Sequence, residues 1–371
     1  MGSVKDLLVL EPAYENRAGI GNFVFSDRYS VFDWGEMPDR ILNKGRSLAV
    51  MAAFNFEQLE LRGIRTHYQG LISPTGNLVR FSDLAEDGGG LATMQVSLAR
   101  VYPPIVREFR FGDRIDVLYD YTFFEKHRGG INNYLVGLEI IFRNGLPLGS
   151  SVFKRIEGAL QLPDTKQRSA QLGRILKGLG LKEPPKPGQM LPQPIMSFTT
   201  KLEAGDRDLS EKEAYRLSGL RRRHFNALKS IALQVNDIIT EQAAKTGFGH
   251  YDGKIETVWD KGFVVCDVIG TFDENRFAWQ GEQVSKEVLR QWYKRNQPEF
   301  VMACDKWKKT GPGWQKSCDV KPQKVSKQFA ALVSQMYMSG CNRYTGKRVF
   351  DSPELEEVME NLKERILNGS G

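Results

Sequence analysis

The sequence predicts an α+β protein that ends in a helical region. The chain has 371 residues, which is enough for two or three domains around separate hydrophobic cores. Short apolar runs between polar turns dominate its first part, and stretches with helical periodicity dominate its last third. This order of elements predicts α+β domains that are followed by helices.

Strands, turns and one helix are expected in residues 5–80. Ser26–Arg28 is a polar turn between two apolar runs, and apolar residues recur at helical spacing over residues 48–61. Two further apolar runs predict strands at residues 115–125 and 134–143. The first part of the chain is therefore expected to be rich in strands.

The second part begins with a proline-rich stretch at residues 162–193, which we interpret as a semi-rigid linker. The strongest helical pattern covers residues 211–245, and Gly247 follows it as a residue suited to a left-handed cap. A β-hairpin is expected at residues 254–268 and a last helix at residues 353–367.

Composition and charge limit the classes of function. No run of 18 apolar residues occurs and the first residues do not form a signal peptide, so we expect a cytoplasmic protein without a membrane span. The four cysteines and four histidines lack the spacing of a zinc site, which leaves Lys, Arg, Asp and Glu for the chemistry. The net charge of +7 admits a polyanionic partner, but no basic motif with interleaved aromatic residues supports nucleic acid. A phosphorylated small molecule would use the same positive potential.

The expected hairpin carries charges on one face. Lys254 and Glu256 lie on the same side of its first strand, because side chains alternate along a strand. With Lys261-Gly262 as a two-residue turn, Glu256 directly faces Asp267 across the ladder. Two opposed carboxylates at about 4–5 Å repel each other by roughly 3–4 kcal/mol at an effective dielectric constant near 20. A positive group is expected to offset this repulsion.

Three interpretations of the acidic hairpin stay open at this point. Mg²⁺ is one candidate for the positive group, since it takes one or two carboxylates together with substrate phosphates. Lys254 is another, and a surface hairpin with solvated charges is the third interpretation. The pairing depends on the turn, because a change of one residue in its length moves one acid to the other face.

Five groups of residues, in order along the chain, resemble the motifs of the SAICAR synthetase (phosphoribosylaminoimidazole-succinocarboxamide synthase) family. The early D-R-x-S-x-F-D and K-G motifs are similar to residues 27–33 and 44–45. The E-x-x-x-R, G-S and K-R motifs are similar to residues 139–143, 149–151 and 154–155. The T-K-x-E-x-G-D-x-D motif is similar to residues 200–208. The D-x-K-x-E … D-E-x-x-T-P-D-x-x-R pattern and the helix after it are similar to residues 252–256, 267, 271–276 and 285–292.

The resemblance implies two mixed α/β domains of the SAICAR-synthase or ATP-grasp-like type, with an ATP cleft between them and C-terminal helices. The domains are then expected at residues 1–130 and 131–282, with the helical region at 283–371. The implied enzyme is an ATP-dependent ligase of purine biosynthesis that joins the carboxylate of carboxyaminoimidazole ribotide to the amine of L-aspartate through an acyl phosphate. The implied cofactors are ATP and Mg²⁺, and the partners are these small molecules rather than nucleic acid or a membrane. A homo-oligomer is left open.

The resemblance also implies roles for residues at matching positions. Glu256 and Asp267 are expected to hold Mg²⁺. The expected catalytic residues are Asp252, Lys254 and Lys201. The expected nucleotide-binding residues are Gly19, Gly21, Lys44, Lys201 and Glu256. The expected substrate-binding residues are Arg143, Ser150, Ser151, Asp273, Arg276, Lys286 and Arg290.

Some features depart from the family's pattern. The turn at Gly19–Phe25 carries no lysine where the family has Gly-Lys, and Glu274-Asn275 stand where serines are usual. An extra acid in a site for anions is compatible with a changed substrate, so another ATP-dependent carboxylate–amine ligase or a small-molecule kinase is the second hypothesis. A basic nucleic-acid-binding protein is the third. Insertions near residues 100–130, 160–190 and 295–320 have no role that the pattern explains.

Overall fold

The computed structural model describes residues 4–111, 114–311 and 313–368. Its strands are β1 (Lys5–Glu11), β2 (Gly19–Phe25), β3 (Tyr68–Ile72), β4 (Leu78–Val79), β5 (Thr93–Leu98), β6 (Ile105–Phe111), β7 (Arg114–Asp120), β8 (Tyr134–Leu135), β9 (Leu138–Leu146), β10 (Gln189–Thr200), β11 (Asp208–Leu209), β12 (Phe248–Trp259), β13 (Phe263–Cys266), β14 (Arg276–Trp279) and β15 (Glu282–Val284). Its α-helices are α1 (Lys44–Leu61), α2 (Thr122–Lys126), α3 (Ser151–Leu160), α4 (Thr165–Gly178), α5 (Glu211–Leu217), α6 (Arg222–Lys245), α7 (Glu287–Asn296), α8 (Pro298–Trp307), α9 (Trp314–Ser317), α10 (Lys327–Thr345) and α11 (Leu355–Asn368). Single 3₁₀ turns lie at Phe81–Asp83 and Lys308–Thr310.

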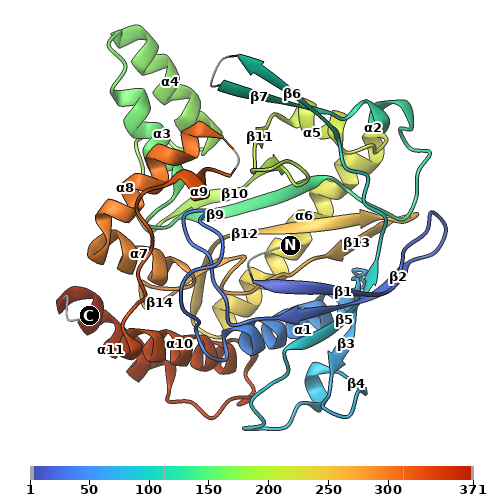
Figure 1. Ribbon diagram of the computed structural model, residues 1–371, viewed down its shortest axis with the longest axis vertical. Helices are drawn as coiled ribbons and strands as arrows, with labels where there is room; N and C mark the ends of the chain where they lie inside the picture. Colours follow the sequence, from blue (N-terminus) through green and yellow to red (C-terminus); the bar gives the residue numbers. More distant parts are fainter. Residues whose placement is uncertain (1–3, 112–113, 312, 369–371) are drawn as a thin grey trace.

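Two sheets form the body of the molecule (Figure 1). The first is antiparallel, with the strand order β1-β2-β5-β3-β4. Helix α1 packs against this sheet and against α10, so that Leu48–Phe56 is buried on every side of the helix. A helix that is apolar around its whole circumference belongs in a core, and α1 accordingly joins the first sheet to the rest of the protein.

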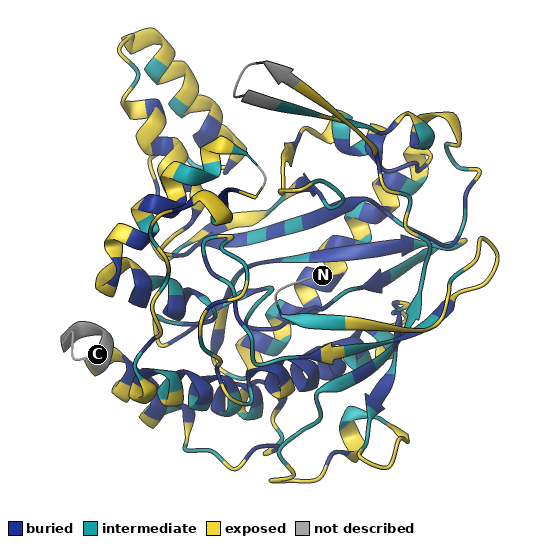
Figure 2. Ribbon diagram, viewed as in Figure 1, coloured by how far each residue is buried: buried dark blue, intermediate teal, exposed yellow. Residues whose placement is uncertain are grey.

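The second sheet has the order β11-β10-β9-β12-β14-β15, with β8 and β13 also paired to β12. Helix α6 packs against β9 and β12, and its apolar stripe, which includes Phe225, Leu228, Val235 and Ile239, is fully buried. This face of α6 therefore belongs to the core. One hydrophobic core runs through both sheets, and a smaller one lies beneath α3 and α4. Figure 2 shows β9 and β12 of the second sheet as mostly buried, whereas α4 is largely exposed.

The predicted linker at residues 162–193 is wrong for most of its length. Residues 165–178 form α4, because Asp164 caps the helix by accepting a hydrogen bond from Gln167 N at 2.7 Å. Ile175 and Leu179 then bury against α3 in the smaller core. Residues 162–164 and the segment between α4 and β10, which contains Pro184, Pro185 and Pro187, are irregular.

Two element boundaries also differ from the prediction. The helix expected at 211–245 is interrupted between α5 and α6, where Gly219 adopts a φ of +68°. The strand expected at 115–125 ends at Asp120 and gives way to α2. In contrast, Gly247 has the expected positive φ, +85°, and the hairpin and last helix lie close to the predicted ranges.

The second sheet and its helices confirm the α+β class, whereas the domain boundaries at residues 130 and 282 stay a prediction. All four cysteines are free and buried. Among the described residues, no helix combines the length and the hydrophobicity that crossing a bilayer requires.

Candidate active site

Three charged side chains alternate along β12, the central strand of the second sheet. Asp252, Lys254 and Glu256 share one face of the strand, and Asp252 and Glu256 are buried. Gly253 lies between the first two, where a Cβ atom would come within 2.0 Å of the Asn275 side chain. Glycine is therefore needed there for the strand to pack against the loop that precedes β14.

The hairpin register differs by one residue from the prediction. Glu256 pairs with Cys266 rather than with Asp267, because the turn has three residues and Lys261 adopts a positive φ of 52°. Regular pairing would now place residue 267 on the other face of the ladder. Instead, the strand ends, and Asp267 takes a left-handed conformation (φ 66°) with its carboxylate 2.5 Å from Lys5 Nζ. The predicted opposition across the ladder is wrong. The charge of Asp267 still acts on the carboxyl group of Glu256.

Strands β9 and β12 and the end of β10 bring opposite charges together in what we call the acid–lysine cluster: Glu139, Lys201, Lys254, Glu256 and Asp267. Lys201 Nζ lies 2.6 Å from Glu256 Oε1 and 3.3 Å from Glu139 Oε1. Lys254 Nζ lies 2.7 Å from the same oxygen of Glu139. The structure thus brings together the predicted catalytic lysines and the predicted metal-binding acids.

Glu256 and Asp267 share an electrostatic environment. Burial and then the charge of Asp267 raise the pKa of Glu256. Burial also acts on Asp267, but Lys5 and Lys201 outweigh it and lower the pKa of that carboxyl. Glutamates and aspartates around Lys201 and Lys254 raise the pKa of both amines in spite of burial, so both stay charged.

The donor set of Glu256 and Asp267 fits Mg²⁺. Glu256 Oε1 is buried and makes no hydrogen bond of good geometry, although it lies 2.6 Å from Lys201 Nζ. A hard cation with oxygen ligands would satisfy such an atom. In the described part of the chain, no group of three or more His, Cys, Asp or Glu side chains is arranged so that it could hold a metal ion. The protein would therefore supply two ligands, and phosphate and water oxygens would supply the others, as is usual for Mg²⁺.

Asp252 is paired with an arginine from each neighbouring strand. It is opposite Arg143 on β9 and opposite Arg276 on β14. Arg276 binds both carboxylate oxygens, whereas Arg143 Nε lies 3.6 Å from Asp252 Oδ2 and is buried without a hydrogen bond. Burial lowers the pKa of Arg143. A buried guanidinium with a free donor is suited to bind a carboxylate or phosphate.

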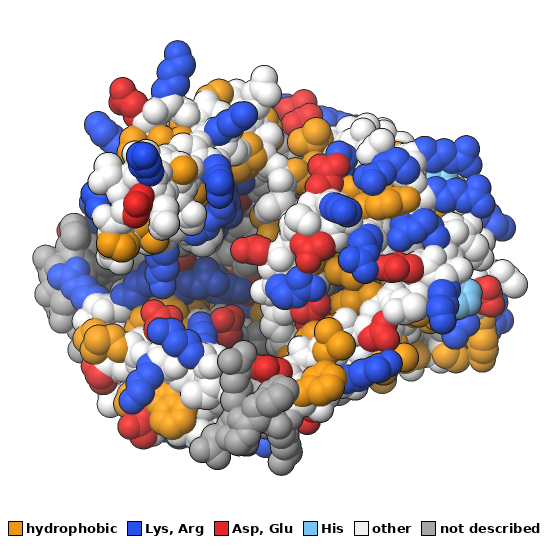
Figure 3. Space-filling model, turned by 90° about the horizontal axis from the view of Figure 1, so that it is seen from above, with side chains coloured by type: hydrophobic (Ala, Val, Ile, Leu, Met, Phe, Trp, Pro, Cys, Tyr) orange, Lys and Arg blue, Asp and Glu red, His pale blue; other side chains and the backbone are white. Residues whose placement is uncertain are grey.

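A cavity of about 770 Å³, which we call the serine cavity, opens at the start of α3. Ser150, Ser151 and Arg290, three of the predicted substrate-binding residues, line it. Their substrate role stays a prediction. Ser150 caps α3 by accepting a hydrogen bond from Val152 N at 3.4 Å, and a helix N-terminus favours anions. Other cationic residues in its wall are Lys154, Lys294 and Lys308. On the face shown in Figure 3, Lys and Arg side chains gather inside a hollow of the surface.

Lys44 and Asp273 contact each other. Lys44 Nζ lies 2.7 Å from Asp273 Oδ2, both side chains are buried, and Tyr337 donates a hydrogen bond to the same carboxylate at 2.7 Å. Lys44 and Lys286 lower the pKa of Asp273 to about 2 against the effect of burial. Burial lowers the pKa of Lys286. The nucleotide and substrate roles of these three residues stay predictions.

Gly19 and Gly21 are explained by close packing within the first sheet. A Cβ atom at Gly19 would meet the backbone of Glu11 at 2.3 Å, and one at Gly21 would meet Leu98 at 2.9 Å. Their nucleotide role stays a prediction. The turn expected at Gly19–Phe25 is wrong, because these residues form strand β2 through pairing with β1 and β5. On the neighbouring β1, Lys5 forms an ion pair with Asp267.

Glu139 of the acid–lysine cluster and Lys5, which forms an ion pair with Asp267 of that cluster, were not predicted as functional. Lys5 had no signal in the sequence, because it approaches Asp267 only through the pairing of β1 with β2. Glu139 belongs to the E-x-x-x-R motif, and the even spacing from Arg143 places both on one face of β9. That spacing could have identified Glu139 as a partner for the lysines.

Comparisons with known proteins agree on one family. The SAICAR synthetase family model matches residues 10–91 and 132–305, which is more than half of the chain. A protein of Archaeoglobus fulgidus with the provisional name phosphoribosylaminoimidazole-succinocarboxamide synthase is 42% identical over 98% of this chain and 99% of its own length. The enzyme of that name from Thermoplasma volcanium is 30% identical over 73% of this chain and 77% of its own length.

Solved structures share the fold at low sequence identity. A SAICAR synthetase in complex with ADP has a TM-score of 0.54 at 19% identity and covers 95% of this chain and 98% of its own. The SAICAR synthase from Saccharomyces cerevisiae, complexed with SAICAR, has a TM-score of 0.58 at 21% identity and covers 94% of both chains. The two sheets, the ordered motifs and these matches lead to one conclusion: the chain belongs to the SAICAR synthetase family.

Proposed function

We propose that this protein is an ATP-dependent ligase that joins the carboxylate of carboxyaminoimidazole ribotide to the amine of L-aspartate, giving SAICAR, ADP and phosphate. The acid–lysine cluster carries the proposal, because it joins two lysines to a pair of acids that fits Mg²⁺. Relatives that bear this enzyme name support it. A cytoplasmic location is part of the proposal.

The proposed chemistry has two steps. A carboxylate oxygen of the ribotide attacks the γ-phosphorus of ATP, the bond from that phosphorus to the bridging oxygen breaks, and ADP leaves. The amine nitrogen of aspartate then attacks the acyl carbon, the carbon–oxygen bond breaks, and phosphate leaves with the electron pair. The ammonium gives up two protons in all, one of which leaves with hydrogen phosphate.

The residues would act by positioning and by neutralising charge, as is usual for phosphoryl transfer. Lys201 and Lys254 would contact the transferred phosphoryl group, while Arg143 and Arg276 would hold the ribotide's anionic groups. The serine cavity would take the ribotide phosphate at the N-terminus of α3. Glu256 and Asp267 would hold Mg²⁺, which supplies charge neutralisation at the phosphate oxygens when it is bound.

One observation favours the second hypothesis, another ligase or a kinase on this scaffold. Glu274, which stands where the family usually has serine, lies 3.3 Å from Lys254. This acid lowers the positive charge that the lysine offers to an anionic substrate. A different carboxylate or amine would then be the substrate.

An ADP-release assay tests the proposal. ADP is expected only when ribotide and L-aspartate are both present, and mass spectrometry is expected to detect SAICAR. Equal ADP formation with other carboxylates and amines would favour the second hypothesis instead. ADP formation with ribotide alone, accompanied by a stable phosphorylated product, would indicate a kinase.

A further inference from the structure

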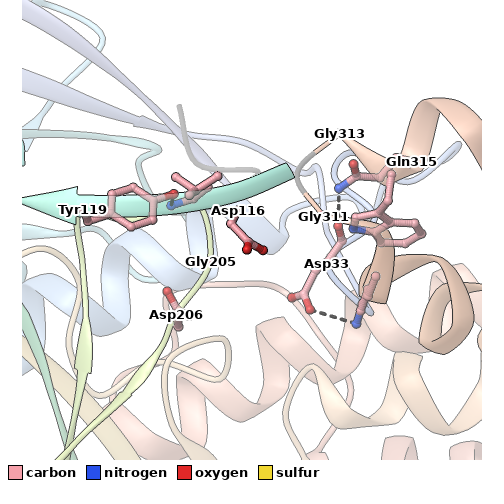
Figure 4. Close-up of a pocket in the computed structure, with 12 residues that line it drawn as sticks. Asp33, Asp116, Tyr119, Gly205, Asp206, Gly311, Gly313 and Gln315 are labelled. Atoms are coloured by element: carbon pink, nitrogen blue, oxygen red, sulfur yellow. Dashed lines mark hydrogen bonds and ion pairs between the residues drawn. The ribbon is translucent and has the colours of Figure 1, made fainter. Parts of the chain in front are cut away.

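A second cavity, of about 720 Å³, adjoins the serine cavity. We call it the acidic cavity, because Asp33, Asp116 and Asp206 line it (Figure 4), and Lys308 is the one cation among the described residues of its wall. Asp33 and Lys308 line both cavities, and their side chains form an ion pair of 2.8 Å. This ion pair therefore stands at the boundary between the two cavities.

The acidic cavity is also next to the acid–lysine cluster. Asp206 follows β10 by a short loop and interacts electrostatically with Glu139, Lys254 and Lys201. Its pKa is raised, first by partial burial and then by the charge of Glu139. A molecule in the acidic cavity would thus lie beside the serine cavity and near the expected phosphoryl-transfer site, which is where the activated carboxylate has to be.

The charge of the acidic cavity selects among the three reactants. Asp33 and Asp206 face a single ammonium group, that of Lys308, among the described residues of its wall, so a nucleotide or a ribotide phosphate would meet carboxylates that this one cation does not balance. Only the amine donor carries a positive group. Its ammonium can be held by carboxylates, which form charge-assisted hydrogen bonds.

The backbone at Asp33 supports a functional role. Phe32 and Asp33 both adopt positive φ angles, 56° and 55°, which are unfavourable for residues other than glycine and persist only where the surroundings enforce them. Gln315 Nε2 holds this segment by donating a hydrogen bond to Asp33 O at 2.8 Å. In Figure 4 the side chain of Asp33 extends into the space that Asp116 faces from β7.

Much of the cavity wall lies outside the segments that the family model matches. Asp116 and Tyr119 belong to the β6–β7 ribbon, and Lys308 and Gln315 follow the end of the matched region. The ribbon is tied to the loop of Asp206, because Tyr119 Oη accepts a hydrogen bond from Ala204 N at 3.0 Å. Two insertions without an assigned role thus meet over one cavity.

We propose that the acidic cavity is the subsite for the amine donor, an amino acid, with Asp33 and Asp206 binding its ammonium group and Lys308 binding one of its carboxylates. This inference rests on the proposed ligase function. The Asp33–Lys308 ion pair matches the charges of the zwitterion. On binding, Asp33 would exchange Lys308 for the ammonium group of the substrate, and Lys308 would exchange Asp33 for one of its carboxylates, so that both side chains keep a partner of opposite charge.

Two variants with matched controls test the subsite. Asp206→Asn removes an ammonium acceptor, and Asp208→Asn changes an exposed acid two residues away that does not line the cavity. Lys308→Met and Lys309→Met form the second pair, since Lys309 is exposed and also outside the cavity wall. The readouts are SAICAR formation from L-aspartate and hydroxamate formation from ribotide, ATP and hydroxylamine. Hydroxylamine is a neutral nucleophile that traps the acyl phosphate without an ammonium subsite.

Asp206→Asn and Lys308→Met are expected to raise KM for L-aspartate by about tenfold or more, because each removes a charged partner of the substrate. Hydroxamate formation by the Asp206→Asn variant should stay within about twofold of the wild type, and so should both activities of the two control variants. An unchanged KM for L-aspartate in both test variants would overturn the subsite. An equal loss of hydroxamate formation in Asp206→Asn would also overturn it, because that loss would assign Asp206 to activation of the ribotide.

A direct binding measurement separates this inference from the proposed function. L-Aspartate is titrated calorimetrically into the wild type and the Asp206→Asn variant. If the wild type makes neither SAICAR nor hydroxamate, the proposed function fails, while binding that is lost in the variant still supports the subsite. If the wild type does not bind L-aspartate, or if both proteins bind it equally well, the proposed subsite is overturned.

Discussion

The acid–lysine cluster shows which residues of the site sequence motifs can identify and which they cannot. The motifs identified Lys201, Lys254, Glu256 and Asp267, and the structure brings all four together. Lys5 was missed because its proximity to Asp267 arises from long-range strand pairing. Residue type and local spacing can therefore identify charged groups, whereas their partners depend on tertiary structure.

Removing either acid of the expected metal site should impair the reaction. Glu256→Gln and Asp267→Asn are each expected to lower kcat by about 10²-fold or more, because one electrostatic stabiliser is lost. Steady-state kinetics at several Mg²⁺ concentrations would measure this effect. Asp260→Asn is the control, since Asp260 lies at the exposed end of the same hairpin with Arg65 3.5 Å away. Near-normal turnover of both variants would exclude the metal role.

Two buried histidines should make the protein sensitive to acid. Burial lowers the pKa of His67 and of His250 to about 4, whereas the unfolded chain binds these protons below about pH 6.5. The unfolded state thus takes up more protons as the pH falls from 6.5 towards 4, and stability is lost in that range. The loss at pH 5 is about 2 kcal/mol per histidine.

Urea unfolding at pH 7 and pH 5 measures this loss. His250→Gln, which cannot take up the proton, is expected to lose less stability between the two pH values than the wild type. His127→Gln is the control, because His127 is exposed. Identical pH dependence of the wild type and His250→Gln would contradict the prediction.

At the level of elements, periodicity predicted where helices and strands occur but not how they pair. The stripe of α6 and the hairpin were located correctly, while the hairpin register was wrong by one residue. Lys261-Gly262 is compatible with a two- or a three-residue turn, and the choice depends on the backbone conformation of Lys261. The α4 segment was misread because its prolines lie after the helix rather than within it.

The close packing of β12 can be tested with two glycines of that strand. Gly253→Ala is expected to destabilise the protein by about 1–3 kcal/mol, because the new Cβ atom would overlap Asn275 and Phe142. Gly249→Ala is the control, since its Cβ atom would meet only ordinary contacts, beginning at 3.7 Å. Chemical denaturation measures both. Equal effects of the two substitutions would show that packing at Gly253 is not tight.

On the scale of the whole molecule, buried ion pairs connect distant parts of the chain. Lys44 begins α1, Asp273 precedes β14, and Tyr337 lies on α10, so one polar contact links three regions. The α+β class could be predicted from the order of elements. The packing of α1 against both α10 and the first sheet could not be predicted, because contacts between distant parts of the chain leave no local sequence pattern.

Two ion pairs of equal length allow the contribution of a buried pair to stability to be compared with that of an exposed pair. Lys44→Met is expected to cost about 3–5 kcal/mol, because Asp273 would keep a buried charge without its partner. Arg62→Met should cost less than about 1 kcal/mol, since the Arg62–Glu241 pair has the same 2.7 Å separation but is solvent-exposed. Urea denaturation of both variants checks the comparison, and similar losses would show that burial is not the decisive factor.

The burial of all four native thiols has a practical consequence. Loss of hydration raises the pKa of Cys304 to about 12 and also raises the pKa of Cys266 and Cys341, so these groups react slowly with alkylating dyes at neutral pH. A single cysteine introduced at the exposed position of Lys309 could therefore carry a fluorophore selectively. Its emission would report, without any change to the native cysteines, when a substrate enters the neighbouring part of the protein.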